Sequence, residues 1–213
     1  QRARRRGGVA WGRGHGGPGG HWGRGAGGVR GVALRQGPPD AVGHLAGDNI
    51  AQGRWNDAKK ARILDSRVKG TALLASALAD MAKPPAVFIS ASAIGWYGDR
   101  GDELLSESSA PGDDFLARVC KAWEAACEPA RAKGIRTVNL RFGFILSPQG
   151  GGLAKMLLPF KLGGGGILGS GKQGSSWIAL DEGPWVIFRA LHADSSAAPG
   201  NPVRPPPLTP QQP

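Results

Sequence analysis

The hydrophobic pattern of this chain changes near Asp40, where short apolar runs begin to alternate with longer amphipathic stretches. This alternation predicts strands separated by helices. The expected strands cover residues 41–47, 86–92, 137–146 and 177–181, and the expected helices cover 57–81, 114–133 and 153–162. Strand, helix, strand, helix and strand at this spacing predict an α/β fold with a parallel sheet and right-handed crossovers.

The second strand carries the most informative residues. Four consecutive apolar residues from Ala86 to Ile89 indicate a central strand that is covered on both faces. Ser90 and Ser92 follow at its carboxyl end, the edge at which doubly wound sheets bind ligands. The alternative is that both serines only satisfy backbone groups of the following loop. The pattern therefore marks a candidate site and leaves its use open.

Residues 1–38 differ in composition from the rest of the chain. They hold eight arginines and no acidic residue, so they contribute +8 of the net charge of +11. Because they are rich in glycine and show no hydrophobic periodicity, we expect an irregular or disordered segment. Its glycines match nucleotide-loop patterns such as Gly12-x-Gly14-x-x-Gly17, but no strand is predicted before them, and so glycine-rich a stretch matches by chance. The segment also suggests nucleic-acid binding, as a less favoured function.

These patterns divide the chain into three predicted parts, namely an Arg/Gly-rich segment (1–38), a partial Rossmann-like domain (39–182) and a Pro-rich tail (183–213). No apolar stretch approaches the length of a membrane span, and the arginine-rich start lacks the apolar core of a signal peptide, so we expect a cytoplasmic protein without membrane contact. Cys120 and Cys127 lie too far apart along one helix to form a disulfide, and no Cys or His cluster indicates a metal site.

Several motifs, in the same order along the chain, resemble one known family. They are His44-Leu45-Ala46-Gly47-Asp48-Asn49-Ile50, Gly53-Arg54-Trp55, residues 62–71, the serine strand through Gly98-Asp99, Trp123-Glu124, Leu140-Arg141-x-Gly143 and Gly169-Ser170-Gly171-Lys172-Gln173. Together they resemble the atypical extended short-chain dehydrogenase/reductases, known as epimerase family proteins. The resemblance implies a Rossmann-like doubly wound sheet and an NAD(P)-dependent epimerase/dehydratase-like oxidoreductase, with NADP(H) favoured.

The same resemblance implies cofactor contacts for individual residues. The turn Leu45-Ala46-Gly47 corresponds to the segment beneath the adenine-ribose side of the dinucleotide, and Ser90 with Ala91 to the strand end beside the nicotinamide. Arg141 and Gly143 correspond to positions near the cofactor and the substrate. The resemblance further implies a small-molecule substrate, with a sugar nucleotide as the candidate, and a homodimer formed through the helices at 57–81 and 114–133.

Candidate catalytic and substrate-binding residues come partly from the resemblance and partly from the residue types near the serine strand. Ser92 corresponds best to the serine that hydrogen-bonds the reacting group, with Ser90 as the second choice. Tyr97 is the only tyrosine and hence the remaining phenol for proton transfer. Trp96 and Trp177 are candidate walls of a substrate pocket. Each of these three aromatic residues could equally be part of the core.

Two family features are not found in the sequence. The Tyr-x-x-x-Lys pair, in which lysine lowers the pKa of tyrosine, would fall on Leu116 and Cys120, and neither can do this chemistry. The first strand, phosphate loop and first helix, which anchor the pyrophosphate, are not seen before His44. We therefore expect an N-terminally incomplete domain with impaired cofactor binding, whose Arg/Gly-rich start and Pro-rich end are out-of-frame or fragmentary translation. A non-catalytic cofactor-binding or scaffold protein on the same fold is the alternative.

Overall fold

The computed structural model describes residues 10–11, 39–164, 166, 174, 176–193 and 199–203. Its main sheet has four parallel strands in the order β1-β2-β3-β4, namely β1 (Ala10–Trp11), β2 (Ala41–His44), β3 (Val87–Ala93) and β4 (Arg136–Phe142). A second parallel pair consists of β5 (Phe144–Leu146) and β6 (Trp177–Ala179). Parallel strands connected through helices confirm the predicted α/β class.

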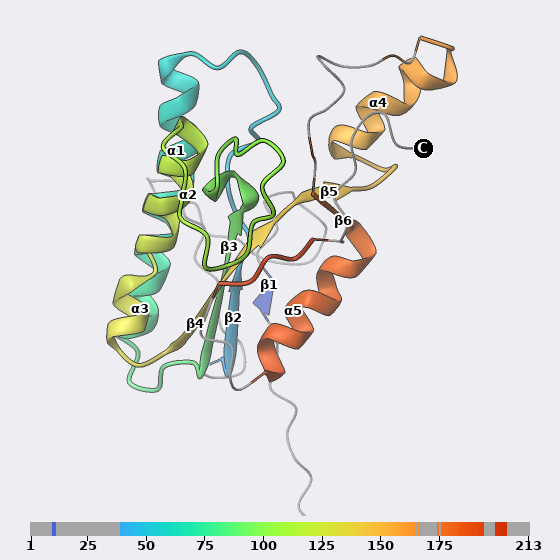
Figure 1. Cartoon of the computed structure of the whole chain (residues 1–213). Helices are drawn as coiled ribbons and strands as arrows, with labels where there is room; N and C mark the ends of the chain where they lie inside the picture. The colour runs from blue at the N-terminus through green and yellow to red at the C-terminus, as the bar shows by residue number, and fades with distance from the viewer. Residues whose placement is uncertain are drawn as a thin grey trace, which may run out of the picture.

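Helices cover both faces of the main sheet. The helices α1 (Asp57–Ala79), α2 (Phe115–Ala125) and α3 (Glu128–Ala132) lie on one side, and α5 (Gly183–His192) lies on the other (Figure 1). The remaining helix, α4 (Gly151–Lys161), lies beside β5 and away from the main sheet (Figure 1). Of the 3₁₀ turns, η1 (Ile94–Trp96) follows β3 and η2 (Leu180–Glu182) follows β6. The sheet is therefore the middle layer of three.

The two faces of β3 bury different residues because side chains alternate along a strand. Val87, Ile89 and Ala91 join the apolar cluster that contains Ile187 and Ala190 of α5. Phe88 points the other way, into a cluster with Ala75 of α1 and Cys127. Ser90 and Ser92 share the face of Phe88, so the two serines point into the layer formed by α1, α2 and α3.

Local sequence signals set the helix ends. Asn56 caps α1 by accepting a hydrogen bond from the backbone nitrogen of Lys59, and Asp114 caps α2 in the same way through Ala117. The helix expected over 114–133 is divided in two, because Pro129 in the first turn of α3 cannot donate the hydrogen bond of a continuous helix.

The N-terminal segment differs from its prediction. The sequence predicts no strand within residues 1–38, but β1 pairs with β2 in parallel, with Ala10 opposite Val42 and Trp11 opposite Gly43. Two residues can pair there because the edge of β2 presents unpaired backbone groups. The pattern Gly12-x-Gly14-x-x-Gly17 follows β1 directly in the chain, but it lies outside the described residues.

Residues 183–213 also differ from their prediction as a tail. The helix α5 occupies residues 183–192, and Gly200 forms backbone hydrogen bonds with Asn139 and Arg141 of β4. The helix is compatible with Pro184, because a proline in the first turn removes a hydrogen bond that no helical partner would accept. This part of the chain completes the sheet and, as shown below, supplies a residue to the candidate site.

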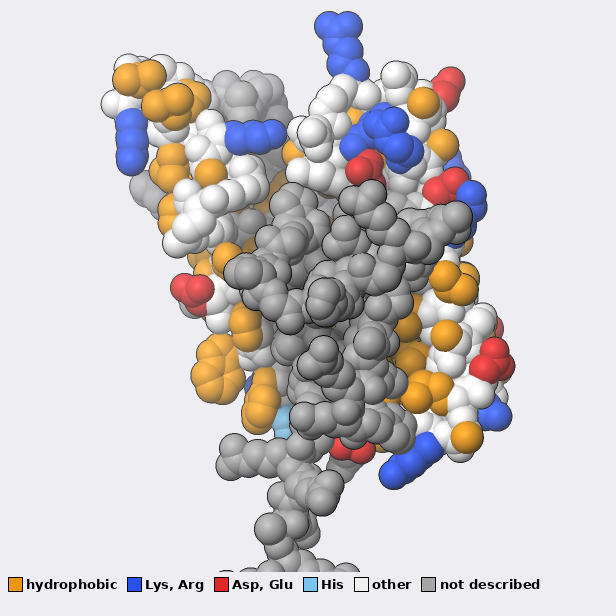
Figure 2. All heavy atoms as spheres, turned by 180° about the vertical axis from the view of Figure 1, so that it is seen from behind, with side chains coloured by type: hydrophobic (Ala, Val, Ile, Leu, Met, Phe, Trp, Pro, Cys, Tyr) orange, Lys and Arg blue, Asp and Glu red, His pale blue; other side chains and the backbone are white. Residues whose placement is uncertain are grey.

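The outer surface of α5 carries large exposed apolar side chains next to Arg189 and His192, and apolar side chains are visible on part of the face seen in Figure 2. Trp185 is 69% exposed and Phe188 is 52% exposed, and their rings form an edge-to-face pair with centroids 6.1 Å apart. Across the described ranges, no helix is long and apolar enough to cross a membrane. The same residues form no group of three or more His, Cys, Asp or Glu side chains that could hold a metal ion.

Candidate functional site

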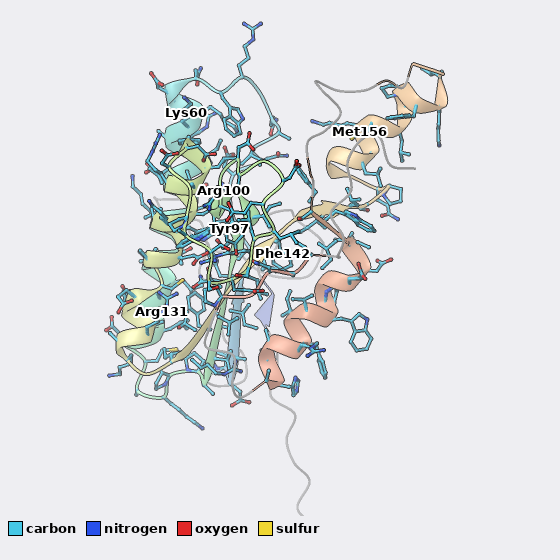
Figure 3. All side chains as sticks on the ribbon, in the orientation of Figure 1. Lys60, Tyr97, Arg100, Arg131, Phe142 and Met156 are labelled. Atoms are coloured by element: carbon cyan, nitrogen blue, oxygen red, sulfur yellow. The ribbon has the colours of Figure 1, made fainter. Side chains whose placement is uncertain are left out.

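The carboxyl ends of β2, β3 and β4 lie side by side and bring most of the predicted site residues to one edge of the sheet. Parallel pairing sets His44 opposite Ser90, and Ser92 opposite Arg141. The turn of residues 45–47 follows β2, and Trp96 and Tyr97 follow β3. Figure 3 shows Tyr97 and Phe142 near this edge, whereas Met156 of α4 lies away from it.

Ser92 lies in a buried network centred on Glu124 of α2. Its Oγ donates a hydrogen bond of 2.7 Å to Glu124 Oε1. Arg141 binds the same carboxylate at two points, from Nε to Oε1 at 2.8 Å and from Nη2 to Oε2 at 3.0 Å. Ser92 is 4% exposed, Glu124 7% and Arg141 3%. A two-point ion pair buried to this extent fixes both charged groups, and with them the end of β3.

Tyr97 is joined to this network through Arg141. Its phenol oxygen accepts a hydrogen bond from Arg141 Nη1 at 3.1 Å and donates one to Asn201 Oδ1 at 2.7 Å. The Arg141 guanidinium also lies over the Trp96 ring, 3.8 Å from its centroid. Burial by itself would lower the pKa of Arg141, but its hydrogen bonds to Glu124 and Tyr97 raise that pKa above the usual value. The only tyrosine of the chain thus has a permanent cation at its hydroxyl.

Ser90 lies deeper than Ser92 and is fully buried. Its Oγ donates to the backbone oxygen of Ala91 at 3.3 Å. Asn139 of β4 lies opposite, donates to Cys127 Sγ and accepts a hydrogen bond from Arg131. Ala91 is buried in the apolar cluster on the α5 side. Ser90 and Ala91 therefore belong to the interior beneath the strand end.

Leu116 and Cys120 lie beside the end of β3. The Cys120 Sγ donates to the backbone oxygen of Ala93 at 3.7 Å, and a Cβ built on Gly95 would lie 3.2 Å from Leu116 Cβ. Burial raises the pKa of Cys120 to about 11, so its thiol is protonated at neutral pH. The positions at which the resemblance would place the Tyr-x-x-x-Lys pair thus hold an aliphatic side chain and a protonated thiol.

The turn Leu45-Ala46-Gly47, called here the open turn, lies at the surface, unlike the buried residues at the ends of β3 and β4. All three residues are exposed, and Leu45 is 42% exposed. The next residue, Asp48, is held by Lys59, whose Nζ lies 2.6 Å from its carboxylate, and this hydrogen bond lowers the pKa of Asp48. The backbone of the open turn is therefore accessible, while the chain immediately after it is anchored to α1.

Gly143 allows the chain to pass from β4 to β5. A Cβ at this position would lie 2.5 Å from the backbone oxygen of Ser176 and 2.8 Å from Val203 Cγ1, so no other residue fits without movement. The strand predicted over 137–146 is divided at this glycine. Gly143 thus has a packing role, and its predicted place near the cofactor stays a prediction.

The two tryptophans predicted to form a substrate pocket lie on different elements. Trp96 packs on Arg141, whereas Trp177 begins β6 and lies opposite Phe144. The described residues form a groove of about 700 Å³ between α5 and residues 199–203, with Leu140 and Ile178 in its lining. Neither tryptophan lines this groove, but Asn201 does. The motif Gly169-Ser170-Gly171-Lys172-Gln173 lies outside the described residues.

Sequence reasoning missed three participants, namely Glu124, Asn201 and the supporting Arg131. A signal for Glu124 was present, because it follows Cys120 by four residues and so shares the buried face of an amphipathic helix. A carboxylate at such a position is expected to be paired. Asn201 carries no comparable signal, because it reaches Tyr97 only through the tertiary fold.

Comparison with known proteins shows similarity over most of the chain. Residues 29–201 match the model of the NAD dependent epimerase/dehydratase family. An epimerase family protein of Mycobacterium bovis is 42% identical over 170 residues, which are 80% of this chain and 56% of that protein. The human epimerase family protein SDR39U1 is 36% identical over 160 residues, which are 73% of this chain and 54% of that protein. The chain thus spans about half the length of these relatives.

Solved structures show the same similarity. The nucleoside-diphosphate sugar epimerase of Corynebacterium glutamicum superimposes with a TM-score of 0.70 at 41% identity, over 81% of this chain and 36% of that one. Human SDR39U1, solved with NADPH, superimposes with a TM-score of 0.75 at 33% identity, over 82% of this chain and 60% of that one.

Proposed function

This chain belongs to the NAD-dependent epimerase/dehydratase family, and we propose that it forms part of an NADP(H)-dependent oxidoreductase acting on a small hydroxyl- or carbonyl-bearing substrate such as a sugar nucleotide. The observation that carries the proposal is the fixed position of Ser92 at the carboxyl end of a central strand, linked through Glu124 and Arg141 to Tyr97. Polar groups held in advance at this edge suit a reaction in which charge develops on a substrate oxygen.

The residues at this edge fit a dinucleotide in part. The open turn has an accessible backbone, and the cation Arg67 lies directly beneath it, so both suit a phosphate-bearing ligand. Ser92 and Tyr97 are bonded to protein groups, so binding would require one of them to exchange a partner. The cofactor, when bound, supplies the hydride chemistry. NADP(H) is favoured because the human relative was solved with NADPH.

Within this proposal, Arg141 orients Tyr97 and stabilises charge on its oxygen. A guanidinium stays protonated throughout, so it can stabilise a phenolate but cannot itself carry the proton. Ser92 then holds the substrate oxygen, and Tyr97 is the group that gives or takes the proton. Tyr97 is 3% exposed, so the segment that carries Asn201 would move for a substrate to reach its hydroxyl.

The test is a pair of measurements on the chain. Quenching of tryptophan fluorescence by NADPH measures binding, and NADPH consumption with UDP-hexoses measures turnover. Ser92→Ala should leave the dissociation constant within about threefold while lowering turnover by about 10²-fold or more, a loss typical of a missing group in proton transfer. Ser76→Ala, an exposed serine on α1, is the matched control. Absence of any response to NADPH or NADH would reject the proposal.

A non-catalytic cofactor-binding or scaffold protein on the same fold is the second candidate. It is favoured by the pairing of Ser92 with Glu124 and by the protonated thiol of Cys120 where the family places lysine. Binding of NADPH without turnover, unchanged by Ser92→Ala, would support this alternative over the oxidoreductase.

A further inference from the structure

Trp55 immediately precedes Asn56, the cap of α1, and its ring is exposed but fixed in place. The residue is 41% exposed. Its indole Nε1 donates a hydrogen bond of 2.8 Å to the backbone oxygen of Ile50. Its ring forms an edge-to-face pair with Phe115, the first residue of α2, with the centroids 5.8 Å apart and the planes at 72°. An exposed ring that is held from two sides loses little conformational freedom when a ligand packs on it.

The Trp55 ring has a face to offer. The Nε1–H group lies in the plane of the ring, so the hydrogen bond to Ile50 occupies only an edge. In an edge-to-face pair, each ring keeps at least one face that its partner does not cover. Within the described ranges, Phe115 is the only ring paired with Trp55, and no lysine or arginine lies over it. A flat group of a ligand can therefore pack on this indole.

The pair of Trp55 and Phe115 lies at the same edge of the sheet as the candidate site. The helix α1 follows β2 and α2 follows β3, and a helix that connects parallel strands begins at the carboxyl edge of the sheet (Figure 1). Leu116, the neighbour of Phe115, packs beside the end of β3, since a Cβ at Gly95 would lie 3.2 Å from Leu116 Cβ. The aromatic pair is thus positioned beside the strand end that carries Ser92.

Lys60 of α1 adds a positive charge to this pair. Its Nζ lies 5.7 Å from the centroid of the Phe115 ring. Within the part of the chain that the structure describes, Lys60 forms no ion pair, whereas Lys69 of the same helix is paired with Asp65 at 2.6 Å. Aromatic faces for rings and cations for phosphates are the two features by which proteins hold nucleotides without reading their sequence. The surroundings of Trp55 therefore suit a ring that carries a phosphate group.

We propose that Trp55, supported by Phe115, is a binding platform for a flat ring of a phosphate-bearing substrate, and that Lys60 faces the phosphate. This inference rests on the proposed function and narrows its substrate to a nucleotide or a sugar phosphate. A nucleobase presents a π face and a hexose presents an apolar face of C–H groups, so both can pack on an indole. The test therefore separates these two sources of the ring.

The test is isothermal titration calorimetry of the whole chain with UDP-glucose, UMP and glucose 1-phosphate. Trp55→Leu should weaken UDP-glucose binding by about tenfold or more, a change that corresponds to about 1.4 kcal/mol. Trp55→Phe keeps an aromatic ring and should recover part of the affinity. The matched control is Trp185→Leu, because Trp185 is also exposed and also forms an edge-to-face pair, but lies on α5 at the other face of the sheet. This control should change the affinity by less than about twofold.

The charge and the source of the ring are tested with the same ligands. Lys60→Gln should weaken UDP-glucose binding by about threefold or more and reduce its dependence on salt, because a cation that faces a phosphate is removed. Lys69→Gln, on the same helix, should leave both unchanged. A loss on Trp55→Leu with UMP but not with glucose 1-phosphate identifies the base as the ring on Trp55, and the reverse identifies the sugar.

Fluorine NMR of the chain labelled with 5-fluorotryptophan gives a readout that does not depend on stability. UDP-glucose should shift the signal of Trp55, assigned through Trp55→Phe, and leave the signal of Trp185 in place. Equal UDP-glucose affinity of the unsubstituted chain and Trp55→Leu, or a loss for NADPH instead of UDP-glucose, would overturn the platform while leaving the proposed function intact. A chain that binds NADPH but none of the three ligands would do the same, and a chain that binds neither NADPH nor NADH would overturn both.

Discussion

Neighbouring strand ends of one sheet are built in opposite ways in this protein. At the ends of β3 and β4, Ser92, Glu124 and Arg141 are buried and bonded to one another. At the end of β2, the open turn is exposed, and among the described residues Arg67 beneath it donates hydrogen bonds only from Nη1. The difference shows that a polar residue at the carboxyl edge of a parallel sheet is not by itself a ligand-binding group, because the fold can use the same position to fix the strand end.

The largest effect on stability is expected when the charge of Glu124 is removed from the buried network. Glu124→Gln keeps the shape of the side chain but leaves Arg141 buried without a counter-ion, so it should lower the free energy of unfolding by about 3–5 kcal/mol. Urea denaturation followed by circular dichroism measures this. Glu103→Gln, which breaks the partly exposed pair with Arg100, should cost less than about 1 kcal/mol. Equal losses in the two variants would show that the end of β3 is not held by its ion pair.

Ser92→Ala tests the next contact of the same network. It removes a hydrogen bond to a charged group and should cost about 1.5–3 kcal/mol in the free energy of unfolding. The same urea experiment measures the loss, with Ser76→Ala on the exposed face of α1 as the reference. A variant as stable as the reference would mean that Ser92 is not held by Glu124 in solution and is free for a ligand.

The pH dependence of stability tests how deeply Cys120 is buried beside the end of β3. Burial raises the pKa of its thiol from 9.0 to about 11, so the unfolded chain releases this proton first. The stability that the folded protein gains by keeping this thiol protonated is fully present below pH 9 and is lost as the pH rises through about 11. Between pH 8 and pH 10 the free energy of unfolding should fall by about 1.4 kcal/mol through this group. Cys120→Ala should show a shallower fall by that amount, and an unchanged slope would contradict the burial of the thiol.

The smallest effect is expected at the open turn. Leu45→Ala removes an exposed side chain and should change the free energy of unfolding by less than about 0.5 kcal/mol. Thermal and urea unfolding both measure this change. A loss comparable to that of Ser92→Ala would mean that the open turn is covered in solution, and the two strand ends would then be alike.

Most of the element order could be predicted from the sequence, because it rests on local signals. Asn56 and Asp114, residue types that favour the N-cap position, cap their helices, and the strands follow apolar runs. The details of packing were less accessible. Ile63 is fully buried on α1, while the neighbouring Leu64 is only partly buried, because helix α1 is rotated to pack against α2 and α3. The helix α5 was missed because its apolar stretch begins with Gly183-Pro184 and was assigned to the Pro-rich tail that follows it.

The sequence by itself determined the α/β class, the position of the serine strand and the lack of a Tyr-x-x-x-Lys pair, since these depend on residue type and spacing along the chain. Only the tertiary structure decided the partners of Ser92 and Tyr97, because Glu124 and Asn201 lie 32 and 104 residues away from them. It also decided that Arg67 lies under Gly47. Such pairings depend on how helices rotate against the sheet and where distant segments return to it, and no local pattern in the chain encodes that geometry.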